Sequence, residues 1–474
     1  MKKITAIVFF ILAFSHGKSQ SQFTNVLISP TGCTEPSICI DPTNTNRIVA
    51  ATNCAYSYYS ADAGLSWDTC QNDTITRGQW AYDACMVADY NGNFYYFHNW
   101  GISPPNITVQ KSFNGGQHWS FDNNVPALYD KEMVCLRPST NELYAVYIPT
   151  TGTDKVGYSK SSDGAVTWTP ATYVNAQTYP GIQWGAAPAV GKLPGQLYVV
   201  WENSAGVYFQ KSIDDGATWL AFDTQLRPFF NSGNGYNCMP SIACDVSSSI
   251  YGGNLYITWW ELDMTGTDTD IYFAKSTDGG NSWNITSIAS DISTNQKWPQ
   301  ITVDPVTGYL YIVYYNQNNP ATQHDIRLLF SFDGGSTFFN VPVSVTPATV
   351  TNWYHHYIGN SAYNGVIRPA WTTNDSLYTA IISQAQLMQW LGTQEYDVTS
   401  AVNIYPNPSY GIFNINAADE GTIRVIDSEG QVIYNSAIEP LNYLTMDLSR
   451  QPVGLYLVTL QTKKGMVTRR IIKM

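Results

Sequence analysis

Seven short stretches of the chain place carboxylate, amine, imidazole or aromatic side chains directly in front of an apolar strand. The candidates for proton transfer or nucleophilic attack are Asp83, Glu132, His355, His356 and Tyr357. Such groups exchange protons with substrates, and paired carboxylates hydrolyse glycosidic bonds. The candidates for holding a substrate are Glu35, Tyr82, Lys131, Trp184, Tyr236, Asn237, Lys297 and Trp298. Because aromatic rings offer an apolar face for the C–H side of a sugar, the set favours a glycan as the ligand.

Each candidate also has a structural interpretation. Carboxylates such as Asp83 commonly pair with a neighbouring unit or cap a strand, and buried charges need such partners. For Lys131 and Lys297, an ion pair between units is the favoured alternative to binding a substrate carboxylate. For His355 and His356, ordinary hydrogen bonding is the favoured alternative to proton transfer. Both interpretations stay open at this point.

One acidic loop has the residue types of a calcium site. Asp263, Asp268 and Asp270 lie within eight residues, and Ca²⁺ takes carboxylate oxygens as ligands. A solvated turn is the favoured interpretation of the same residues. We therefore expect no cofactor and no metal site, with calcium at this loop as the alternative.

A recurring octapeptide shows which elements must position the candidates. Its pattern is Ser-x-Asp-x-Gly-x-Ser/Thr-Trp, and complete copies begin at Ser60, Ser212 and Ser276. Three variant copies begin at Ser112, Ser161 and Ser331. They contain, respectively, Asn114 in place of Asp, Ala165 in place of Gly, and Phe338 in place of Trp. Self-similarity at such intervals is typical of repeat architectures.

The octapeptide has the composition of a hairpin turn. An Asp side chain accepts hydrogen bonds from the backbone of a turn, and Gly supplies a position with positive φ. The aromatic ring then fills the space between the hairpin and its sheet. The Asp residues of these turns are therefore expected to be structural, not catalytic.

The segments around each turn predict four antiparallel strands per repeat, which is the blade of a β-propeller. Two apolar strands precede each turn, as at residues 36–41 with 47–51 and at 240–245 with 254–259, a third enters the turn and a fourth leaves it. Residues 353–358, 365–371 and 376–383 predict three further strands without a turn motif. Residues 23–29 resemble an outermost strand and would complete that last blade, so seven blades are favoured over six.

The C-terminal segment departs from the repeat and predicts a small β-sandwich. It opens with Tyr405-Pro-Asn-Pro408, contains the strand Gly454-Leu-Tyr-Leu-Val458 and ends in basic residues. These features resemble the C-terminal sorting domain of the type IX secretion pathway of Bacteroidetes. The resemblance implies contact with the type IX machinery, export across the outer membrane, and release or attachment at the cell surface. A carbohydrate-binding or adhesion module is the alternative.

The turn motifs resemble those of bacterial neuraminidase repeat proteins, so the chain resembles a sialidase-like propeller. Sialidases of this superfamily carry three arginines that clamp the sialate carboxylate, one of them in an Arg-Ile-Pro motif, with an Asp acid/base and a Tyr/Glu pair. Here the propeller has arginines only at 47, 77, 137, 227, 327 and 368, and Arg47 is followed by Ile-Val. No arginine is carried over as a member of the clamp, so strict sialidase activity is doubtful.

Composition and the N-terminus agree with export. Lys2 and Lys3 followed by an apolar run at 4–14 predict a signal peptide over residues 1–20. Eight cysteines suit an oxidising compartment. Cys54 and Cys70 are the best candidates for a disulfide, and Cys39, Cys85, Cys135 and Cys244 are expected in the core. The net charge of −12 argues against a nucleic-acid partner, and no later segment is long and apolar enough to span a membrane.

The sequence thus predicts an all-β protein in four parts. They are a signal peptide at 1–20, a propeller at 21–390, a linker at 391–402 and a sorting domain at 403–474. The expected function is a secreted carbohydrate-active propeller that cleaves a glycan, either as a glycosidase or as a polysaccharide lyase. Lyases of seaweed polysaccharides with seven blades resemble this arrangement in broad outline. A non-catalytic glycan-binding or adhesion propeller is the alternative, since one fold hosts both.

Overall fold

The computed structural model describes residues 23–474 with several gaps. The gaps are 32–33, 54–55, 71–81, 101–105, 150–154, 178–182, 230–237, 263–265, 267, 292, 319–322, 345–347, 350–356, 374–375, 394–401, 418–419, 428–430, 440–442 and 463–464. The chain divides into two compact units, Met1–Gln384 and Ala385–Met474. Each unit is considered by itself.

In the described part of the first unit, the strands pair into seven antiparallel sets of four. The first three sets are β2 (Ser37–Ile40), β3 (Ile48–Ala51), β4 (Ser57–Ser60) and β5 (Asp68–Thr69); β6 (Tyr82–Ala88), β7 (Phe94–Trp100), β8 (Asn106–Ser112) and the first half of β9 (Ser120–Leu136); and the second half of β9 with β10 (Leu143–Pro149), β11 (Gly157–Ser161) and β12 (Thr172–Tyr173). The long strand β9 thus joins the second and third sets into one sheet.

The remaining four sets follow the same order. They are β13 (Trp184–Val190), β14 (Leu197–Asn203), β15 (Gly206–Ser212) and β16 (Thr224–Pro228); β17 (Ser241–Cys244), β18 (Leu255–Leu262), β19 (Thr269–Ser276) and β20 (Asn284–Ala289); β21 (Thr294–Val303), β22 (Leu310–Asn318), β23 (Gln323–Ser331) and β24 (Phe339–Pro342), with β25 (Ala348–Thr349) also on β23; and β26 (Gly359–Tyr363), β27 (Val366–Thr373), β28 (Ser376–Ser383) and β1 (Thr24–Ser29).

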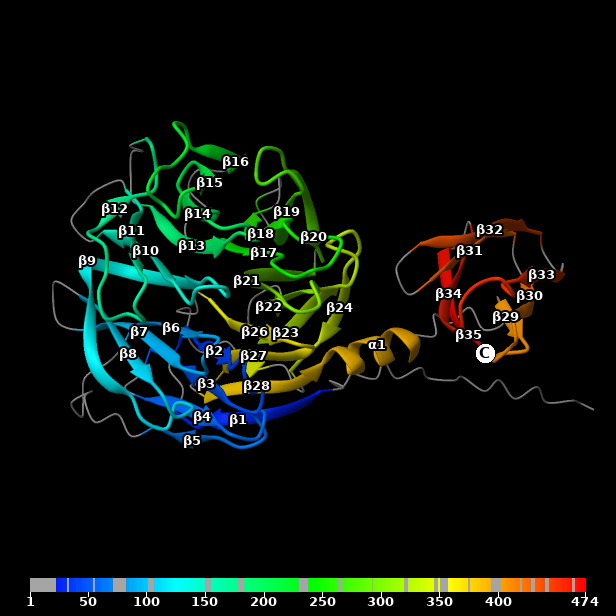
Figure 1. Ribbon diagram of the computed structural model, residues 1–474, viewed down its shortest axis with the longest axis horizontal. Helices are drawn as coiled ribbons and strands as arrows, with labels where there is room; N and C mark the ends of the chain where they lie inside the picture. The colour runs from blue at the N-terminus through cyan, green and yellow to red at the C-terminus, as the bar shows by residue number, and fades with distance from the viewer. Residues whose placement is uncertain are drawn as a thin grey trace, which may run out of the picture. The chain divides into compact units, whose positions relative to one another are not determined.

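The sets form a β-propeller around a common centre (Figure 1). The first strands of successive sets contact one another in a closed cycle that runs β2, β6, β9, β13, β17, β21, β26 and back to β2. Second strands such as β10 and β14 are buried at every position, because each is covered by a neighbouring set on both faces. Their apolar residues therefore occur in continuous runs, in contrast to the alternation of a half-exposed strand.

The first strand of the described chain closes the ring. β1 pairs antiparallel with β28, with Thr24 opposite Ile381 and Val26 opposite Thr379, and Figure 1 shows the two strands side by side. Arg368 Nε of the last set also donates to the carbonyl of Ala63 in the turn of the first set, at 2.9 Å. The N-terminal strand thus completes the set of β26, β27 and β28 as its outermost strand, as the sequence predicted.

Direction along the strands separates the two ends of the propeller. The six octapeptide turns follow the third strand of their sets, whereas the candidate site residues lie before or near the start of the first strand. Because antiparallel strands alternate in direction, these two positions lie at opposite ends of the sheets. We call them the turn end and the mouth end.

The second unit begins with a helix and continues as a two-sheet sandwich. α1 (Gln384–Thr393) is followed by one sheet of β29 (Val402–Tyr405), β30 (Ile412–Ala417) and β33 (Tyr443–Asp447), and another of β31 (Gly421–Ile426), β32 (Val432–Ile438), β34 (Gly454–Thr462) and β35 (Gly465–Lys473). Phe413 and Ile415 of one sheet pack with Val425 and Val458 of the other in a shared core. The β-sandwich prediction is confirmed. The expected end of the propeller at residue 390 falls inside α1, and the first unit ends at Gln384.

The cysteines and the surface bear on other expectations. No disulfide is present among the described cysteines, and the Cys70 thiol donates to the carbonyl of Gln117 at 3.2 Å. Cys54 lies outside the described residues, so the Cys54–Cys70 pair stays a prediction.

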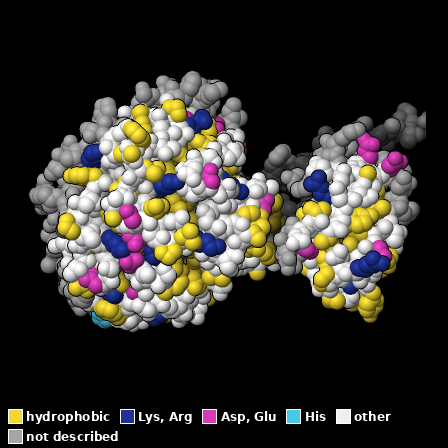
Figure 2. Space-filling model, turned by 45° about the horizontal axis from the view of Figure 1, so that its top comes forward, with side chains coloured by type: hydrophobic (Ala, Val, Ile, Leu, Met, Phe, Trp, Pro, Cys, Tyr) yellow, Lys and Arg dark blue, Asp and Glu magenta, His cyan; other side chains and the backbone are white. Residues whose placement is uncertain are grey.

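No described helix has the length and apolar character needed to cross a membrane. On the face shown in Figure 2, Lys and Arg side chains are scattered among acidic and uncharged ones.

Candidate functional site

Six of the seven sets carry a residue with positive φ just before the first strand, at its start or, for Lys131 and Trp298, inside it. These residues are Glu35, Asp83, Lys131, Gly185, Met239 and Trp298, with φ between 43° and 60°. The strand pairing shifts register at the same place in several sets, for example between Tyr82 and Cys85. Non-glycine residues rarely adopt this conformation, and bulges turn side chains to new directions, often beside active sites. We call these six residues the mouth ring.

Three members of the mouth ring form one charged assembly. The ammonium of Lys131 lies 3.5 Å from Glu35 Oε1 and 3.4 Å from Asp83 Oδ1. The three side chains come from three different sets, yet their residues are only 8%, 3% and 6% exposed. Since both carboxylate oxygens touch one nitrogen, they lie at most about 7 Å apart.

Two asparagines that the sequence reasoning missed hold this assembly together. Asn53 donates through Nδ2 to Glu35 Oε2, and its Oδ1 accepts from the backbone N–H of Asp83 at 2.7 Å. Asn99 donates through Nδ2 to Asp83 Oδ2 at 2.8 Å. Both follow or end the second strand of a set. They fix the two carboxylates relative to each other across a boundary between sets.

Glu132 and Tyr357 extend the assembly into what we call the mouth cluster: Glu35, Asp83, Lys131, Glu132 and Tyr357. Glu132 is fully buried and Tyr357 is 6% exposed. The phenolic oxygen of Tyr357 has no hydrogen-bond partner among the described residues. Burial, and then the charges of Glu35, Asp83 and Glu132, raise the pKa of Tyr357 well above its ordinary value. The phenol therefore keeps its proton and is available as a donor.

The other side of the mouth ring is aromatic and carries one lysine, Lys297. The Trp298 ring packs edge-on against Trp260 at 6.4 Å and Tyr315 at 5.9 Å between ring centroids. The ammonium of Lys297 lies 5.1 Å from the centre of the Trp260 ring, and burial lowers the pKa of Lys297. At Gly185, an added Cβ would lie 3.0 Å from the Cα of Met239. The mouth thus has a charged arc and an aromatic arc.

The remaining candidates are placed as follows. Tyr82 has an exposed side chain and Trp184 is half-buried. Tyr236, Asn237, His355 and His356 lie outside the described residues. Asp268 and Asp270 are buried, whereas Asp263 also lies outside the described residues, and the described residues contain no cluster of three side chains suited to a metal ion. Calcium at this loop stays a prediction.

The described arginines are engaged away from the mouth cluster. Arg47 pairs with Asp41, Arg327 with Asp325 at 3.2 Å, and Arg227 with Glu261 at 2.9 Å. Arg368 donates to backbone carbonyls, including that of Ile382 at 2.9 Å. Arg77 lies outside the described residues. The described part of the mouth therefore offers no guanidinium clamp for a carboxylate.

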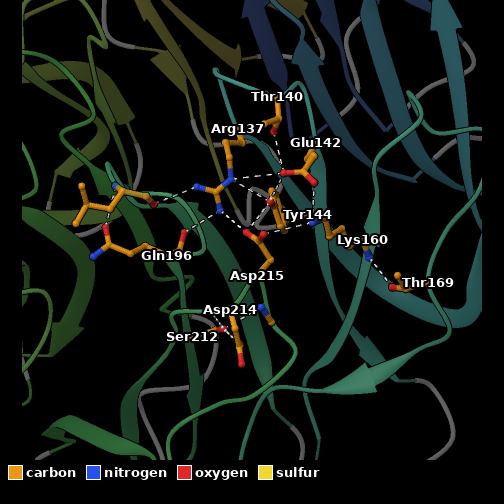
Figure 3. Close-up of polar contacts among 12 residues, drawn as sticks. Arg137, Thr140, Glu142, Tyr144, Lys160, Thr169, Gln196, Ser212, Asp214 and Asp215 are labelled. Atoms are coloured by element: carbon orange, nitrogen blue, oxygen red, sulfur yellow. Dashed lines mark hydrogen bonds and ion pairs between the residues drawn. The ribbon is translucent and has the colours of Figure 1, made fainter.

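Arg137 belongs to a charged network at the turn end (Figure 3). Its Nη2 lies 2.7 Å from Asp215 Oδ1, which sits in the octapeptide turn of the next set, and its Nε donates to Tyr144 Oη at 3.0 Å. Lys160 Nζ lies 2.7 Å from Glu142 Oε1 in the same network. Figure 3 shows these side chains converging on one another from neighbouring sets. The network joins two blades and has the character of a structural link.

The octapeptide turns satisfy their own Asp residues. Asp214 accepts from the hydroxyl of Ser212 at 2.7 Å, and from the N–H and hydroxyl of Thr218 at 2.8 and 2.6 Å. The Thr218 hydroxyl, followed by that of Ser212, lowers the pKa of Asp214 to about 2. In the variant copy, Asn114 Oδ1 accepts from Ser112 and from the N–H of His118. These turns are closed hydrogen-bond units, as the sequence predicted.

A match to a family model was found at the C-terminus. Residues 403–474 match the secretion system C-terminal sorting domain, which confirms the predicted resemblance to a type IX sorting domain. The protein is therefore secreted or attached to the cell surface. No curated protein matched the chain.

Solved structures similar to this chain include several propellers at low identity. The NanB sialidase of Streptococcus pneumoniae has 10% identity, a TM-score of 0.45 and coverage of 69% of each chain. An ulvan lyase, described as a new family of polysaccharide lyase, has 12% identity and a TM-score of 0.49 over 76% of this chain and 96% of the other. An α-L-arabinanase of Penicillium chrysogenum has 12% identity and a TM-score of 0.43 over 64% and 93%.

Proposed function

We propose that the propeller is a carbohydrate-active enzyme that cleaves a glycosidic bond at the mouth cluster. The observation that carries the proposal is the Glu35–Lys131–Asp83 assembly, in which two carboxylates from different blades meet one ammonium at 3.5 and 3.4 Å. Glu132 and the unpartnered phenol of Tyr357 lie in electrostatic reach of it.

The energetic cost of this assembly supports a functional role. Burying an ion costs several kcal/mol before pairing offsets it, and a non-glycine residue held at positive φ costs about 1–3 kcal/mol. Glu35, Asp83 and Lys131 combine both costs at one place. The second strands of the blades are buried and largely apolar. The concentration of buried charge at the mouth therefore differs from the packing of the core and favours a functional site.

The chemistry available is that of a two-carboxylate glycosidase. Glu35 and Asp83 both receive N–H donors; one carboxylate would act as the base or nucleophile, and the other, when protonated, would give its proton to the leaving oxygen. Tyr357, whose raised pKa keeps the phenol protonated, suits a hydrogen-bond donor to the sugar and not the general acid. Carboxylate pairs in glycosidases lie about 5–9.5 Å apart, and the two contacts with Lys131 limit the separation of Glu35 Oε1 and Asp83 Oδ1 to at most about 7 Å.

A lyase is less well supported by the described residues. A lyase acting on a uronate needs a cation that neutralises the sugar carboxylate, and Lys131 is already shared by two carboxylates. The same consideration, together with the engaged arginines, argues against a strict sialidase. His355 and His356, which would serve lyase chemistry, lie outside the described residues, so their catalytic role stays a prediction.

A non-catalytic glycan-binding or adhesion propeller is the second candidate. The observation that favours it is the high burial of the mouth cluster, since Glu35, Asp83 and Lys131 then resemble an ion network that closes the channel. Under this alternative the three charges stabilise the ring, and a glycan binds elsewhere.

The test is a hydrolysis screen with the secreted full chain and a matched pair of variants. The chain is incubated with soluble neutral, amino and acidic polysaccharides. New reducing ends are quantified together with the ultraviolet absorbance of unsaturated products, which a lyase would release. The proposal expects reducing ends without unsaturated products, lost in Asp83→Asn and retained in Asp214→Asn. Cleavage that survives Asp83→Asn at the native rate, or binding of a glycan with no cleavage of any substrate, would overturn it.

A further inference from the structure

The motif that opens the sorting domain lies against the last strand of the chain. After β29 the backbone leaves its own sheet and runs along β35, the edge strand of the other sheet, before it enters β30. Ser409 and Lys473 form a parallel bridge at that crossing. Tyr405–Pro408 and the basic C-terminal end are two of the features by which this segment resembles a sorting domain. In the folded chain these two features are in direct contact.

Asn407 takes the place of a neighbouring strand at this edge. Its Nδ2 donates to the carbonyl of Arg470 at 2.8 Å, and its Oδ1 accepts from the N–H of Ile472 at 2.9 Å. The residues on both sides of Asn407 are prolines, which have no backbone N–H to donate. The side-chain amide of Asn407, which both donates and accepts, therefore supplies the pair of groups that a peptide unit supplies in a β-ladder.

The backbone of Ser409 continues the same ladder. Its N–H donates to the carbonyl of Ile472 at 2.9 Å, and its carbonyl accepts from the N–H of Met474 at 2.8 Å. The outward-facing groups from the Arg470 carbonyl to the Met474 N–H are thus all bonded to Asn407 or Ser409. An uncovered edge strand presents such groups to solvent or to other chains. We call residues Tyr405–Ser409 the C-terminal clamp, because they fix the register of the last five residues.

The C-terminal clamp fixes backbone and leaves side chains at the surface. Ile472 is 47% exposed, and Leu455, which lies opposite it on β34, is 48% exposed. Asn407 is also exposed, and the core of the sandwich is built by other residues, such as Phe413 and Val458. The hydrogen bonds of Asn407 therefore order the end of the chain without being needed for the core.

We propose that the Tyr405–Pro408 motif acts in sorting through the C-terminal strand, and that Asn407 is the positioning residue that couples the two. A chain end that is already ordered loses less conformational entropy when it is recognised, so the clamp favours recognition by the secretion system. The inference concerns the residues that match the secretion system sorting domain. It does not depend on glycan cleavage at the mouth cluster.

The first measurement is amide hydrogen exchange in the purified full chain, with fragmentation that resolves single amides near the C-terminus. Asn407→Ala should speed exchange at Ile472 about three- to tenfold, because the Ile472 N–H loses its acceptor. Asn414→Ala is the matched control. Asn414 accepts from Thr445 in the other sheet at 3.0 Å, so this variant should leave Ile472 at the native rate. Native exchange in β31 and β34 shows that each variant keeps a folded sandwich.

The second measurement is export, which a purely structural role of Asn407 would leave unchanged. The full chain is expressed in a Bacteroidetes host with a type IX pathway, and the fraction in the medium and on the cell surface is quantified by immunoblot. Asn407→Ala should lower that fraction about three- to tenfold, in proportion to the lost order, and Asn414→Ala should not. Asn407→Asp keeps the acceptor for Ile472 and loses the donor to Arg470, so its export should fall between native and Asn407→Ala.

A double variant tests whether the motif and the strand act as one unit. Ile472→Pro removes the N–H that Asn407 accepts. If the two act together, Asn407→Ala combined with Ile472→Pro should export no less than the poorer single variant.

Three outcomes would overturn the inference. They are export losses that multiply in the double variant, faster exchange at Ile472 with native export, and native exchange at Ile472 in Asn407→Ala. Each leaves the proposal for the mouth cluster untouched, because that proposal is tested by the polysaccharide screen.

Discussion

The two ends of the propeller use the same residue types in different ways. At the turn end, the Asp214 carboxylate accepts its hydrogen bonds from Ser212 and Thr218 of its own octapeptide, and it is exposed to solvent. At the mouth end, Asp83 is buried; its carboxylate accepts from Asn99 of its own blade and pairs with Lys131 of the next blade, while its backbone N–H donates to Asn53 of the preceding blade. Both ends place a residue at positive φ close to the carboxylate.

The difference shows how to separate structural from functional carboxylates in a repeat protein. A carboxylate whose partners lie within its own turn is self-contained, so every repeat can keep it without reference to the others. A carboxylate whose partners come from other blades depends on the closed ring, and no two blades supply it identically. The mouth cluster is of the second kind, and this asymmetry between blades is what a binding site requires.

The sharpest test of this comparison is an activity measurement on one Asp from each end. Asp83→Asn should lower kcat/KM for the glycan substrate by about 10²–10⁴-fold, because it removes a group placed to exchange a proton or attack. Asp214→Asn should change it less than twofold. Initial rates of reducing-end release measure both, and equal losses in the two variants would remove the functional distinction between the ends.

Stability should respond next most strongly to loss of the mouth cation. Lys131→Met leaves Glu35 and Asp83 buried beside each other without their shared ammonium, which is expected to cost about 3–5 kcal/mol. Lys192→Met, at an exposed turn-end position, should cost less than about 0.5 kcal/mol. Urea unfolding at pH 7 gives both values. A fully stable Lys131→Met variant would mean that the mouth carboxylates are not held as an ion network.

Gly→Ala substitutions test how much the packing at the turn end contributes to stability. Gly216 has φ +82°, and an added Cβ would lie 2.5 Å from the Tyr158 ring of the preceding blade. Gly216→Ala should therefore destabilise by about 2–4 kcal/mol through backbone strain and overpacking. Gly253 has φ +97° with open space around it, so Gly253→Ala should cost only about 1 kcal/mol. Equal thermal shifts in the two variants would show that the packing between blades at this turn is loose.

The smallest expected effect is on acid stability. Hydrogen bonds lower the pKa of Asp214 to about 2 in the folded chain, from about 3.9 when unfolded. A depressed folded pKa contributes stability above the unfolded pKa, and that contribution is lost as the pH falls from about 4 toward 2. The thermal unfolding midpoints of the native protein and of Asp214→Asn are compared at pH 6 and at pH 2.5, and the difference between the two proteins should be smaller at pH 2.5. A larger difference at pH 2.5 would show that ionised Asp214 does not stabilise the fold.

The sequence foretold the elements whose signals are local. The octapeptide turns can be recognised in the sequence because Ser60, Asp62 and Gly64 form hydrogen bonds with one another within a few residues. The strands before the turns also repeat. Aligning those repeats was enough to place Glu35, Asp83 and Lys131 at comparable positions. The N-terminal strand could be assigned to the last blade because residues 23–29 resemble an outermost strand elsewhere in the chain.

What the sequence did not foretell depends on contacts between blades. Asn53 and Asn99 lie at or just after the ends of second strands, and Asn203 and Asn318 end two further second strands. The position could therefore be recognised in the sequence, but the partners of Asn53 and Asn99 appear only when the blades are packed together. Positive φ at Trp298 is a property of the bulge between Lys297 and Gln300 and not of the residue type. Helix α1 did carry a local signal, since Gln384–Thr393 is rich in Gln, Leu, Met and Ala, which favour helices, but the strand repeat obscured it.

Closure of the ring through β1 has a consequence for synthesis. The strand that completes the last blade is the first described segment of the chain, and its partner β28 is made about 350 residues later. A chain interrupted before residue 376 would leave β1 without this partner, so closure of the ring depends on residues from both ends of the propeller sequence.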